Sequence, residues 1–280
     1  MAHLEGNRRG STTGAERPFL SRPSFPSSAR VDQLLPLAIV AVALMAWEWG
    51  ARSGYITTLF FPAPSTTVET LGKLLGEGDL LTHLGASLRR VLLGILFGGV
   101  PGLLLGLLIG WSRRLHTVID PLIAAAHPIP KIAVLPLIMV IFGVGETPKV
   151  IIAATGAFFP MVINTAAGAR QINRIYFEVA RNYGAGPLRV LARVILPGSL
   201  PFMLSGLLLA LNITLLLTIA VEMVSGYSGL GSMIWFAWET MRVEEIYASL
   251  AVITLLGIVF NLALRHLSRF LVPWQVERER

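Results

Sequence analysis

A short polar stretch, EVARNYG at residues 178–184, interrupts two long apolar runs and decides how the chain folds. The runs on either side, residues 150–169 and 194–221, contain no Asp, Glu, Lys or Arg, and the second opens with VILP at residues 194–197. Each run reaches the ~20 residues that a helix needs to cross a bilayer. Ile175, Val179 and Tyr183 recur at four-residue steps, which predicts a short connecting helix with one apolar face.

The composition indicates a membrane protein. Hydrophobic residues make up 54% of the 280 residues and charged residues 14%, with a mean hydropathy of +0.68. A single soluble core could not bury that much apolar surface. The chain has no cysteine, which excludes disulfides, Cys-ligated metals and thiol catalysis. Its net charge of +7 comes from basic residues beside apolar runs, so nucleic-acid binding is not expected.

The remaining apolar runs predict an all-α protein with six transmembrane helices. Residues 91–112 and 246–264 are free of charged residues, and a first span over residues 34–51 ends in a Trp-rich belt. The third span, residues 117–142, is apolar but interrupted by polar residues and prolines. We expect it to be kinked or locally unwound along a protein-enclosed or watery path. The interrupting residues are Asp120, His127, Pro128, Pro130 and Lys131.

The distribution of basic residues predicts that both termini are cytoplasmic, because cytoplasmic loops retain Lys and Arg. In this orientation only six basic residues lie outside, and Lys131 lies within a span, while all other Lys and Arg lie inside. The six outside residues are Arg52, Lys73, Arg89, Arg90, Lys149 and Arg242. Residues 1–33, rich in Ser, Pro, Gly and Arg, are expected to form a disordered tail. Residues 34–270 then form one permease-like membrane domain, and residues 271–280 a cytoplasmic C-terminal tail.

Further motifs accompany the polar loop. They are FPAPS (residues 61–65), SLRR (87–90), DPL (120–122), PIPK (128–131), FGVGE (142–146), GAFFP (156–160), EM (222–223) and SGLG (228–231). Together with the loop, which resembles the "EAA" loop of ATP-binding-cassette importer permeases, they make residues 33–274 similar to the nitrate/sulfonate/taurine/bicarbonate-type permeases. Val179 and Val194 are mild apolar departures from the usual loop pattern.

The resemblance implies a type I importer permease that works as a dimer. Its loop, about residues 170–198, would dock on two separate ATPase subunits, and its outer surface would receive solute from a periplasmic or lipid-anchored binding protein. The chain has no G-x-x-x-x-G-K-[ST] motif, so the partners would bind ATP and Mg and hydrolyse the ATP. The chain itself is expected to be no enzyme and to hold no cofactor or metal. The expected coupling residues are Ile175, Glu178, Val179, Ala180, Arg181, Tyr183, Gly184 and Pro197.

The resemblance also implies import of a small solute, expected to be anionic, into the cytoplasm across a bacterial inner membrane. Nitrate, bicarbonate, sulfonates, taurine, aromatic organics and pyrimidine precursors all remain open. Asn212-Ile213-Thr214 stands where similar permeases often have Gly-Arg-Ala, so any role of that basic residue in the pathway is absent here.

Polar residues within the spans are candidates for the translocation pathway. They are His127, Lys131, Asn164, Asn212, Thr214 and Glu222. Lys131 could attract an anion, but pairing with Glu222 or Asp120 is the favoured interpretation. For the Asn and Thr residues, interhelical hydrogen bonding is favoured. A glycine series at positions 102, 106 and 110 predicts close helix packing or a dimer contact.

The sequence also bears on two other functions. A hydrolase is a poor fit, because Leu230 breaks a G-x-S-x-G match in the turn at residues 226–231 and no H-E-x-x-H occurs. A secondary transporter or channel, with Lys131, Asp120 and Glu222 coupling ions, is the alternative to an ATP-driven importer.

Overall fold

The computed structural model describes residues 29–274, which are helical with no strand among them. The expected tail over residues 1–33 and the last residues of the C-terminal tail lie mostly outside this range. Residues from Trp47 onward form one compact unit, and α1 up to Ala46 belongs to a separate unit. The all-α fold class predicted from the sequence is confirmed.

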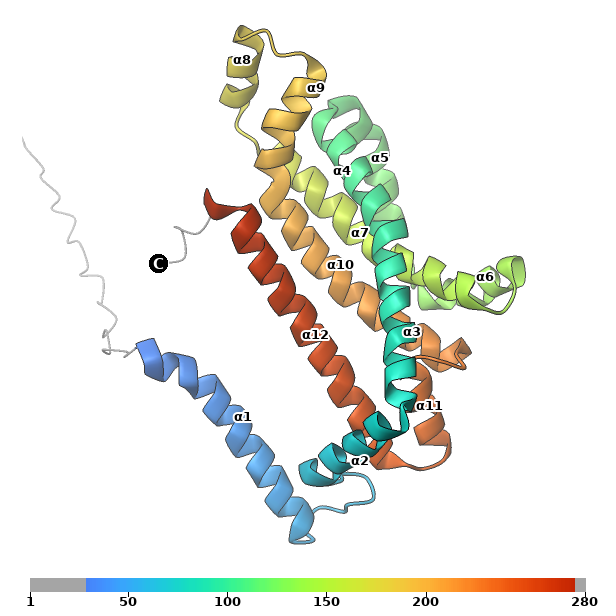
Figure 1. Cartoon of the computed structure of the whole chain (residues 1–280). Helices are drawn as coiled ribbons and strands as arrows, with labels where there is room; N and C mark the ends of the chain where they lie inside the picture. The colour runs from blue at the N-terminus through green and yellow to red at the C-terminus, as the bar shows by residue number, and fades with distance from the viewer. Residues whose placement is uncertain (1–28, 275–280) are drawn as a thin grey trace, which may run out of the picture. The chain divides into compact units, whose positions relative to one another are not determined.

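The helices follow one another with short connections (Figure 1). They are α1 (Ala29–Arg52), α2 (Pro64–Glu77), α3 (Asp79–Gly94), π-helical η1 (Ile95–Gly99), α4 (Val100–Trp111), α5 (Arg113–Ala126), 3₁₀-helical η2 (Ile132–Val134), α6 (Leu135–Phe142), α7 (Glu146–Arg170), α8 (Arg174–Asn182), α9 (Pro187–Val190), π-helical η3 (Leu191–Ile195), α10 (Leu196–Ser225), α11 (Leu230–Glu239) and α12 (Val243–Leu271).

Five of these helical segments are long and apolar enough to cross a membrane. They are Leu34–Arg52, Asp79–Trp111, Glu146–Arg170, Pro187–Ser225 and Val243–Leu271, and five of the six predicted spans fall on them. The second begins at Asp79 rather than at Val91, because Arg89 and Arg90, which precede the charge-free run, belong to the same helix.

The predicted third span is the one that is not a continuous helix. α5 ends at Ala126, residues 127–131 form a turn, and the chain continues through η2 into the short helix α6. The expectation of local unwinding is therefore confirmed, and it follows from Pro128 and Pro130, which cannot donate the backbone hydrogen bonds of a helix. Only residues 132–142 of this region form an apolar helical segment. The third span, and with it the count of six spans, therefore stays a prediction.

The core of the unit is the packing of α7 against α10 and against η1 and α4. Glycines make the second contact possible: a Cβ atom at Gly98 would lie 1.9 Å from the carbonyl oxygen of Ala154, and one at Gly106 would lie 2.7 Å from that of Val162. Gly102 and Gly110 meet α7 in the same way. The glycine series therefore packs within the chain, as one of the two sequence interpretations predicted.

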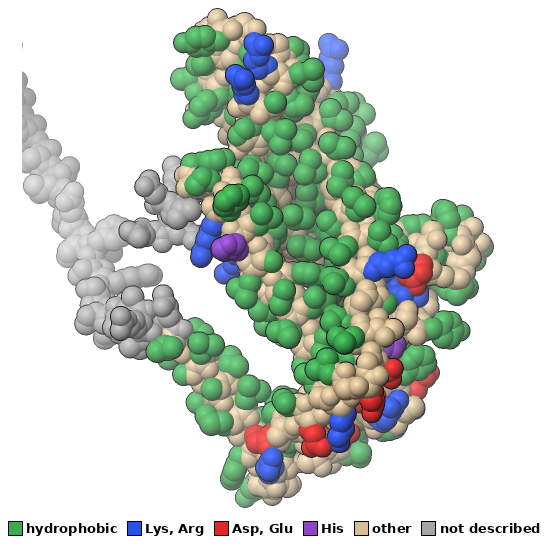
Figure 2. Space-filling model, in the orientation of Figure 1, with side chains coloured by type: hydrophobic (Ala, Val, Ile, Leu, Met, Phe, Trp, Pro, Cys, Tyr) green, Lys and Arg blue, Asp and Glu red, His purple; other side chains and the backbone are tan. Residues whose placement is uncertain are grey.

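The two ends of the helical unit differ in charge. α8 and α9 lie beyond the end at which α10 starts, whereas α2 and α11 lie at the other end (Figure 1). On the face drawn in Figure 2, hydrophobic side chains cover the middle, basic side chains without acidic ones mark the α8–α9 end, and acidic and basic side chains are mixed towards α2, α11 and α6. The orientation of these ends across the membrane stays a prediction from the distribution of Lys and Arg.

Candidate coupling helix and transport groove

The candidate coupling loop contains a well-defined helix, α8. The side chain of Asn173 caps its N-terminus, with Oδ1 accepting a hydrogen bond from the Ile175 N–H at 3.0 Å. At the other end Gly184 takes a φ of +68°, and the Ala185 N–H donates to the Ala180 carbonyl at 2.9 Å. A left-handed glycine of this kind stops a helix, as the sequence predicted.

The two faces of α8 have different environments. Phe177 is half-buried and packs against the cluster around Leu107 and Ile195, which attaches the helix to α4 and η3. Ile175, Val179 and Tyr183 are 57%, 47% and 86% exposed. The predicted apolar stripe therefore faces away from this chain and is available to another protein.

Charged residues surround this stripe. Glu178 and Arg181 are exposed, while Ala180 is half-buried beneath them. Within the described residues, neither Glu178 nor Arg181 forms an ion pair. Their charges are free to meet a partner.

Pro197 lies close to the base of α8. It is near the start of α10, directly after the π-helical turn η3, and lines a hollow of about 780 Å³ with Asn173, Tyr176 and Arg193. Asn173 and Pro197, near the two ends of the candidate loop, therefore line the same hollow.

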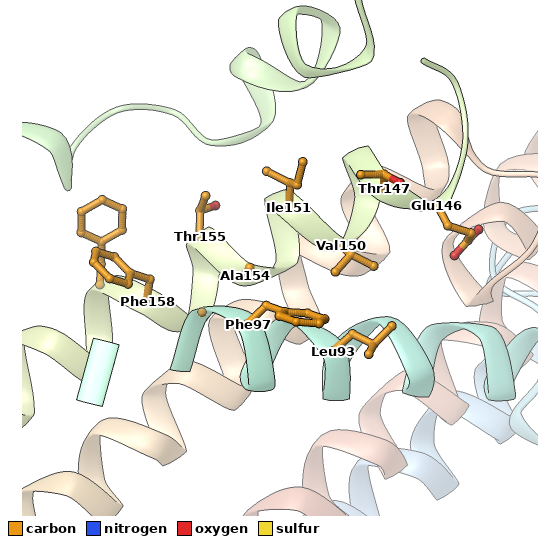
Figure 3. A pocket seen from close by; sticks show the side chains of 11 residues that line it. Leu93, Phe97, Glu146, Thr147, Val150, Ile151, Ala154, Thr155 and Phe158 are labelled. Carbon is orange, nitrogen blue, oxygen red and sulfur yellow. The ribbon is translucent and has the colours of Figure 1, made fainter. Parts of the chain in front are cut away.

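A largely apolar groove of about 690 Å³ lies between α3–η1 and α7. Figure 3 shows Leu93 and Phe97 on one wall and the α7 side chains from Glu146 to Phe158 on the other. Glu146 and Thr147 supply polar atoms at one end, and Phe158 lies at the other. Phe159 also lines the groove. The groove could admit a small molecule.

Lys131 and His127 meet at the phenylalanine end of this groove. Lys131 Nζ lies 4.8 Å from the centre of the Phe159 ring and donates a hydrogen bond to the His127 carbonyl oxygen. The His127 ring lies 5.3 Å from the same phenylalanine. The helix break thus brings a cation and two aromatic rings together beside an apolar passage.

The favoured pairing of Lys131 with Glu222 or Asp120 is wrong. Lys131 forms no ion pair with a carboxylate in residues 29–274. Asp120, in the middle of α5, lies 4.0 Å from Arg170 at the C-terminal end of α7, and Glu222 lies near the C-terminal end of α10. The break after Ala126 changes the direction of the chain, so spacing along an ideal helix did not predict the partners.

Glu222 belongs to a buried ionic network that sequence reasoning missed. Arg90, 1% exposed, donates from Nη1 to Glu222 Oε1 at 2.6 Å, and from Nε and Nη2 to Glu146 at 2.8 and 2.6 Å. Lys149 Nζ lies 3.3 Å from the same Glu146. Buried charges are tolerated when they are paired and hydrogen-bonded in this way. We call these four residues, which lie at the end of the helices predicted to face outside, the outer ionic cluster.

Neutral groups complete the coordination of Glu222. Ser87 donates its hydroxyl to the carboxylate at 2.8 Å, and the Gly231 N–H donates at 3.0 Å. Arg90 also donates to the Ser228 hydroxyl at 2.8 Å. Gly229 has a φ of +116°, and a Cβ atom there would lie 2.2 Å from the Glu222 carboxyl carbon, so only glycine fits. The turn before α11 is therefore shaped around this carboxylate.

The other candidate pathway residues make local or interhelical hydrogen bonds. Asn164 donates to the Pro160 carbonyl at 2.9 Å, and Thr214, fully buried, donates to the Ala153 carbonyl at 3.4 Å. Asn212 accepts from the Asn261 side chain at 3.2 Å. The structure does not bring these residues together with His127 and Lys131, and none of them lines the groove.

Comparison with known proteins agrees with this architecture. Residues 102–276 match the family described as "Binding-protein-dependent transport system inner membrane component". The chain is 33% identical over 258 residues to the taurine transport system permease protein TauC of Escherichia coli (strain K12), covering 90% of this chain and 93% of the relative. It is also 33% identical over 250 residues to the putative aliphatic sulfonates transport permease protein SsuC of Bacillus subtilis (strain 168), covering 89% and 91%.

A solved structure shares the fold. It is a chain of the MetNI methionine ABC transporter in inward-facing conformations, which superposes with a TM-score of 0.60 at 19% identity over 68% of this chain and 94% of that chain. The resemblance expected from the sequence motifs is thus confirmed, and the chain belongs to the inner membrane permease components of binding-protein-dependent ABC importers, of the sulfonate and taurine type.

Proposed function

We propose that this chain is the membrane-spanning subunit of an ATP-driven importer whose motion is delivered through α8. The observation that supports the proposal is the outward-facing apolar stripe of Ile175, Val179 and Tyr183 on a helix anchored by Phe177. A helix held on one face and bare on the other can seat in a groove of a partner and transmit its displacement. Two such ATPase partners would act on a dimer of this chain.

The ATPases would supply all the hydrolysis. The sequence contains no P-loop motif, so ATP and Mg belong to the partner subunits and this chain is not itself an enzyme. ATP-driven approach of the two α8 helices would shift the permease between inward- and outward-facing states. The chain would lie in a bacterial inner membrane as six spans with both termini in the cytoplasm.

The solute would be small and anionic. The taurine and aliphatic sulfonate permeases to which the chain is similar support a solute with a sulfonate group, and the aliphatic sulfonates among these solutes are anions. A binding protein outside the membrane would deliver the solute. Inside the chain, the groove offers an apolar passage with the cation of Lys131 at one end. An anion with a short apolar tail suits both features.

Two glycines near the end of α8 give a matched test. Gly184 has a φ of +68°, whereas Gly186 has an ordinary φ of −69°, and a Cβ atom at either position would meet nothing within 4 Å. Gly184→Val should therefore distort the end of α8, and Gly186→Val should not.

The measurement is affinity purification of the chain from its native membrane, with mass spectrometry of the proteins that accompany it. We expect a P-loop ATPase with the wild type and with Gly186→Val, and its loss with Gly184→Val. ATP-driven uptake of the solute into proteoliposomes should follow the same pattern. Uptake by the purified chain alone, without an ATPase, would overturn the proposal in favour of a secondary transporter or channel.

A further inference from the structure

The four side chains of the outer ionic cluster differ in their exposure to solvent. Arg90 and Glu222 are buried, with side chains 1% and 0% exposed, and Lys149 is 7% exposed, but Glu146 is 51% exposed. Glu146 also lines the groove together with Thr147 (Figure 3). One carboxylate of the cluster therefore stands between two buried cations and the open groove.

We propose that Glu146 occupies a binding site for a monovalent oxyanion, and that a carboxylate or sulfonate entering the groove takes its place on Arg90 and Lys149. This inference rests on the proposed function and deepens it, because it names the ligand class and a first binding point within the permease.

The hydrogen-bond geometry suits such a ligand. Arg90 presents Nε and Nη2 to the two oxygens of Glu146 at 2.8 and 2.6 Å, a bidentate arrangement that a carboxylate or sulfonate can reproduce. Lys149 Nζ, 3.3 Å from Oε1, supplies a further donor. The donors are held in place without Glu146, because Arg90 is also bound by Glu222 and by the Ser228 carbonyl oxygen at 2.6 Å.

Charge balance selects the valency of the ligand. The two cations Arg90 and Lys149 are neutralised by the two carboxylates Glu222 and Glu146. If Glu146 turns into solvent, one positive charge is left uncompensated among buried groups, which is costly. A monoanion restores neutrality, whereas a dianion leaves an excess negative charge. The site is therefore expected to prefer methanesulfonate to sulfate.

The tethered carboxylate sets the affinity. Glu146 competes from within the same molecule at a high effective concentration, so the wild type should bind a free anion weakly. Such weak binding suits a passage, since a solute held tightly would not move on. Removal of the competing carboxylate should strengthen anion binding.

The test uses the full chain, purified in lipid nanodiscs without ATPase subunits. The thermal unfolding midpoint is measured against methanesulfonate, and against sulfate at matched ionic strength. For Glu146→Ala we expect a saturable rise with methanesulfonate at a concentration at least about tenfold below that of the wild type. Glu69→Ala is the matched control, since Glu69 is an exposed carboxylate paired with Lys73. It should respond as the wild type does.

The second part of the test removes the Lys149 charge from the site that lacks Glu146. The variant Glu146→Ala with Lys149→Gln leaves only the neutral Arg90–Glu222 pair, so the methanesulfonate response should disappear. An equal response in Glu146→Ala and Glu69→Ala, or a response to sulfate as strong as to methanesulfonate, would overturn the inference.

If Glu146→Ala does not fold, Glu146→Gln replaces it. If neither folds, the wild type must itself show a saturable response that Lys149→Gln abolishes and Lys73→Gln keeps, and its absence rejects the site.

These outcomes separate the inference from the proposed function. Anion binding is measured without ATP or partners, while the proposed function is tested by ATPase association and ATP-driven uptake. Normal ATP-driven uptake with no gain of binding in Glu146→Ala rejects only the oxyanion site. A gain of binding in a chain that transports without an ATPase rejects only the importer.

Discussion

Arg90 and Glu222 form a fully buried ion pair, 2.6 Å from Nη1 to Oε1, that joins α3 to α10 across 132 residues of sequence. Arg90→Met removes one partner and leaves the Glu222 charge buried, which should destabilise the chain by ~3–5 kcal/mol. The change is measured as a fall in the thermal unfolding midpoint of the purified protein.

The adjacent arginine supplies the control for this prediction. Arg89 is exposed on the same helix turn, so Arg89→Met should have little effect. Because Arg90→Met with Glu222→Met removes both charges, it should be more stable than the sum of the two single changes implies. Equal effects of Arg89→Met and Arg90→Met would contradict the buried pair.

The contact between η1 and α7 depends on Gly98. Its missing Cβ would lie 1.9 Å from the Ala154 carbonyl oxygen, so Gly98→Ala forces the two helices apart and should cost ~1–3 kcal/mol of stability. Gly72 in α2 has nothing within 4 Å of the equivalent position, and Gly72→Ala should stabilise its helix by ~0.5–1 kcal/mol. Opposite shifts of the unfolding midpoint are therefore expected, and a neutral Gly98→Ala would contradict the close packing.

Much of this fold could be predicted from the sequence. Charge-free runs located the five long apolar helices, because burial in a bilayer leaves that pattern directly in the residues. The limits of α8 were predictable as well, since the step from Ile175 to Val179 and the stop at Gly184 are local signals. The break in the third span follows in the same way from its prolines.

The outer ionic cluster was not predicted, although its members were all visible in the sequence. Arg90, Glu146 and Glu222 stand at the ends of apolar runs on the same predicted side of the membrane, which was the available signal. Which charges pair across helices depends on how the helices are arranged, and that is a tertiary property. For the same reason Lys131, placed by the turn at residues 127–131, was given the wrong partner.

Lys131 should affect transport without affecting assembly. Its ammonium group lies over Phe159, in the middle of α7, whereas the α8 contact surface begins after the C-terminal end of α7. We expect Lys131→Met to slow ATP-driven uptake several-fold, and Lys131→Arg, which keeps a cation over the ring, to retain most of it. ATPase recovery in affinity purification should be unchanged in both variants. Unaltered uptake in Lys131→Met would reduce the residue to a packing role.

Asn173 should control the affinity for the ATPase through the start of α8. Its side chain caps the helix at 3.0 Å from the Ile175 N–H, and removal of an N-cap costs ~1 kcal/mol of helix stability. Asn173→Ala should therefore fray the first turn of α8, leave the Ile175 side chain without a fixed position, and weaken ATPase binding several-fold. Asn182, the last residue of the same helix, makes no side-chain hydrogen bond in the described part of the chain, so Asn182→Ala is the matched control. Binding of the purified ATPase to each variant in nanodiscs measures the difference. If both alanine variants bound equally well, the apolar stripe would not need a capped α8 to reach its partner.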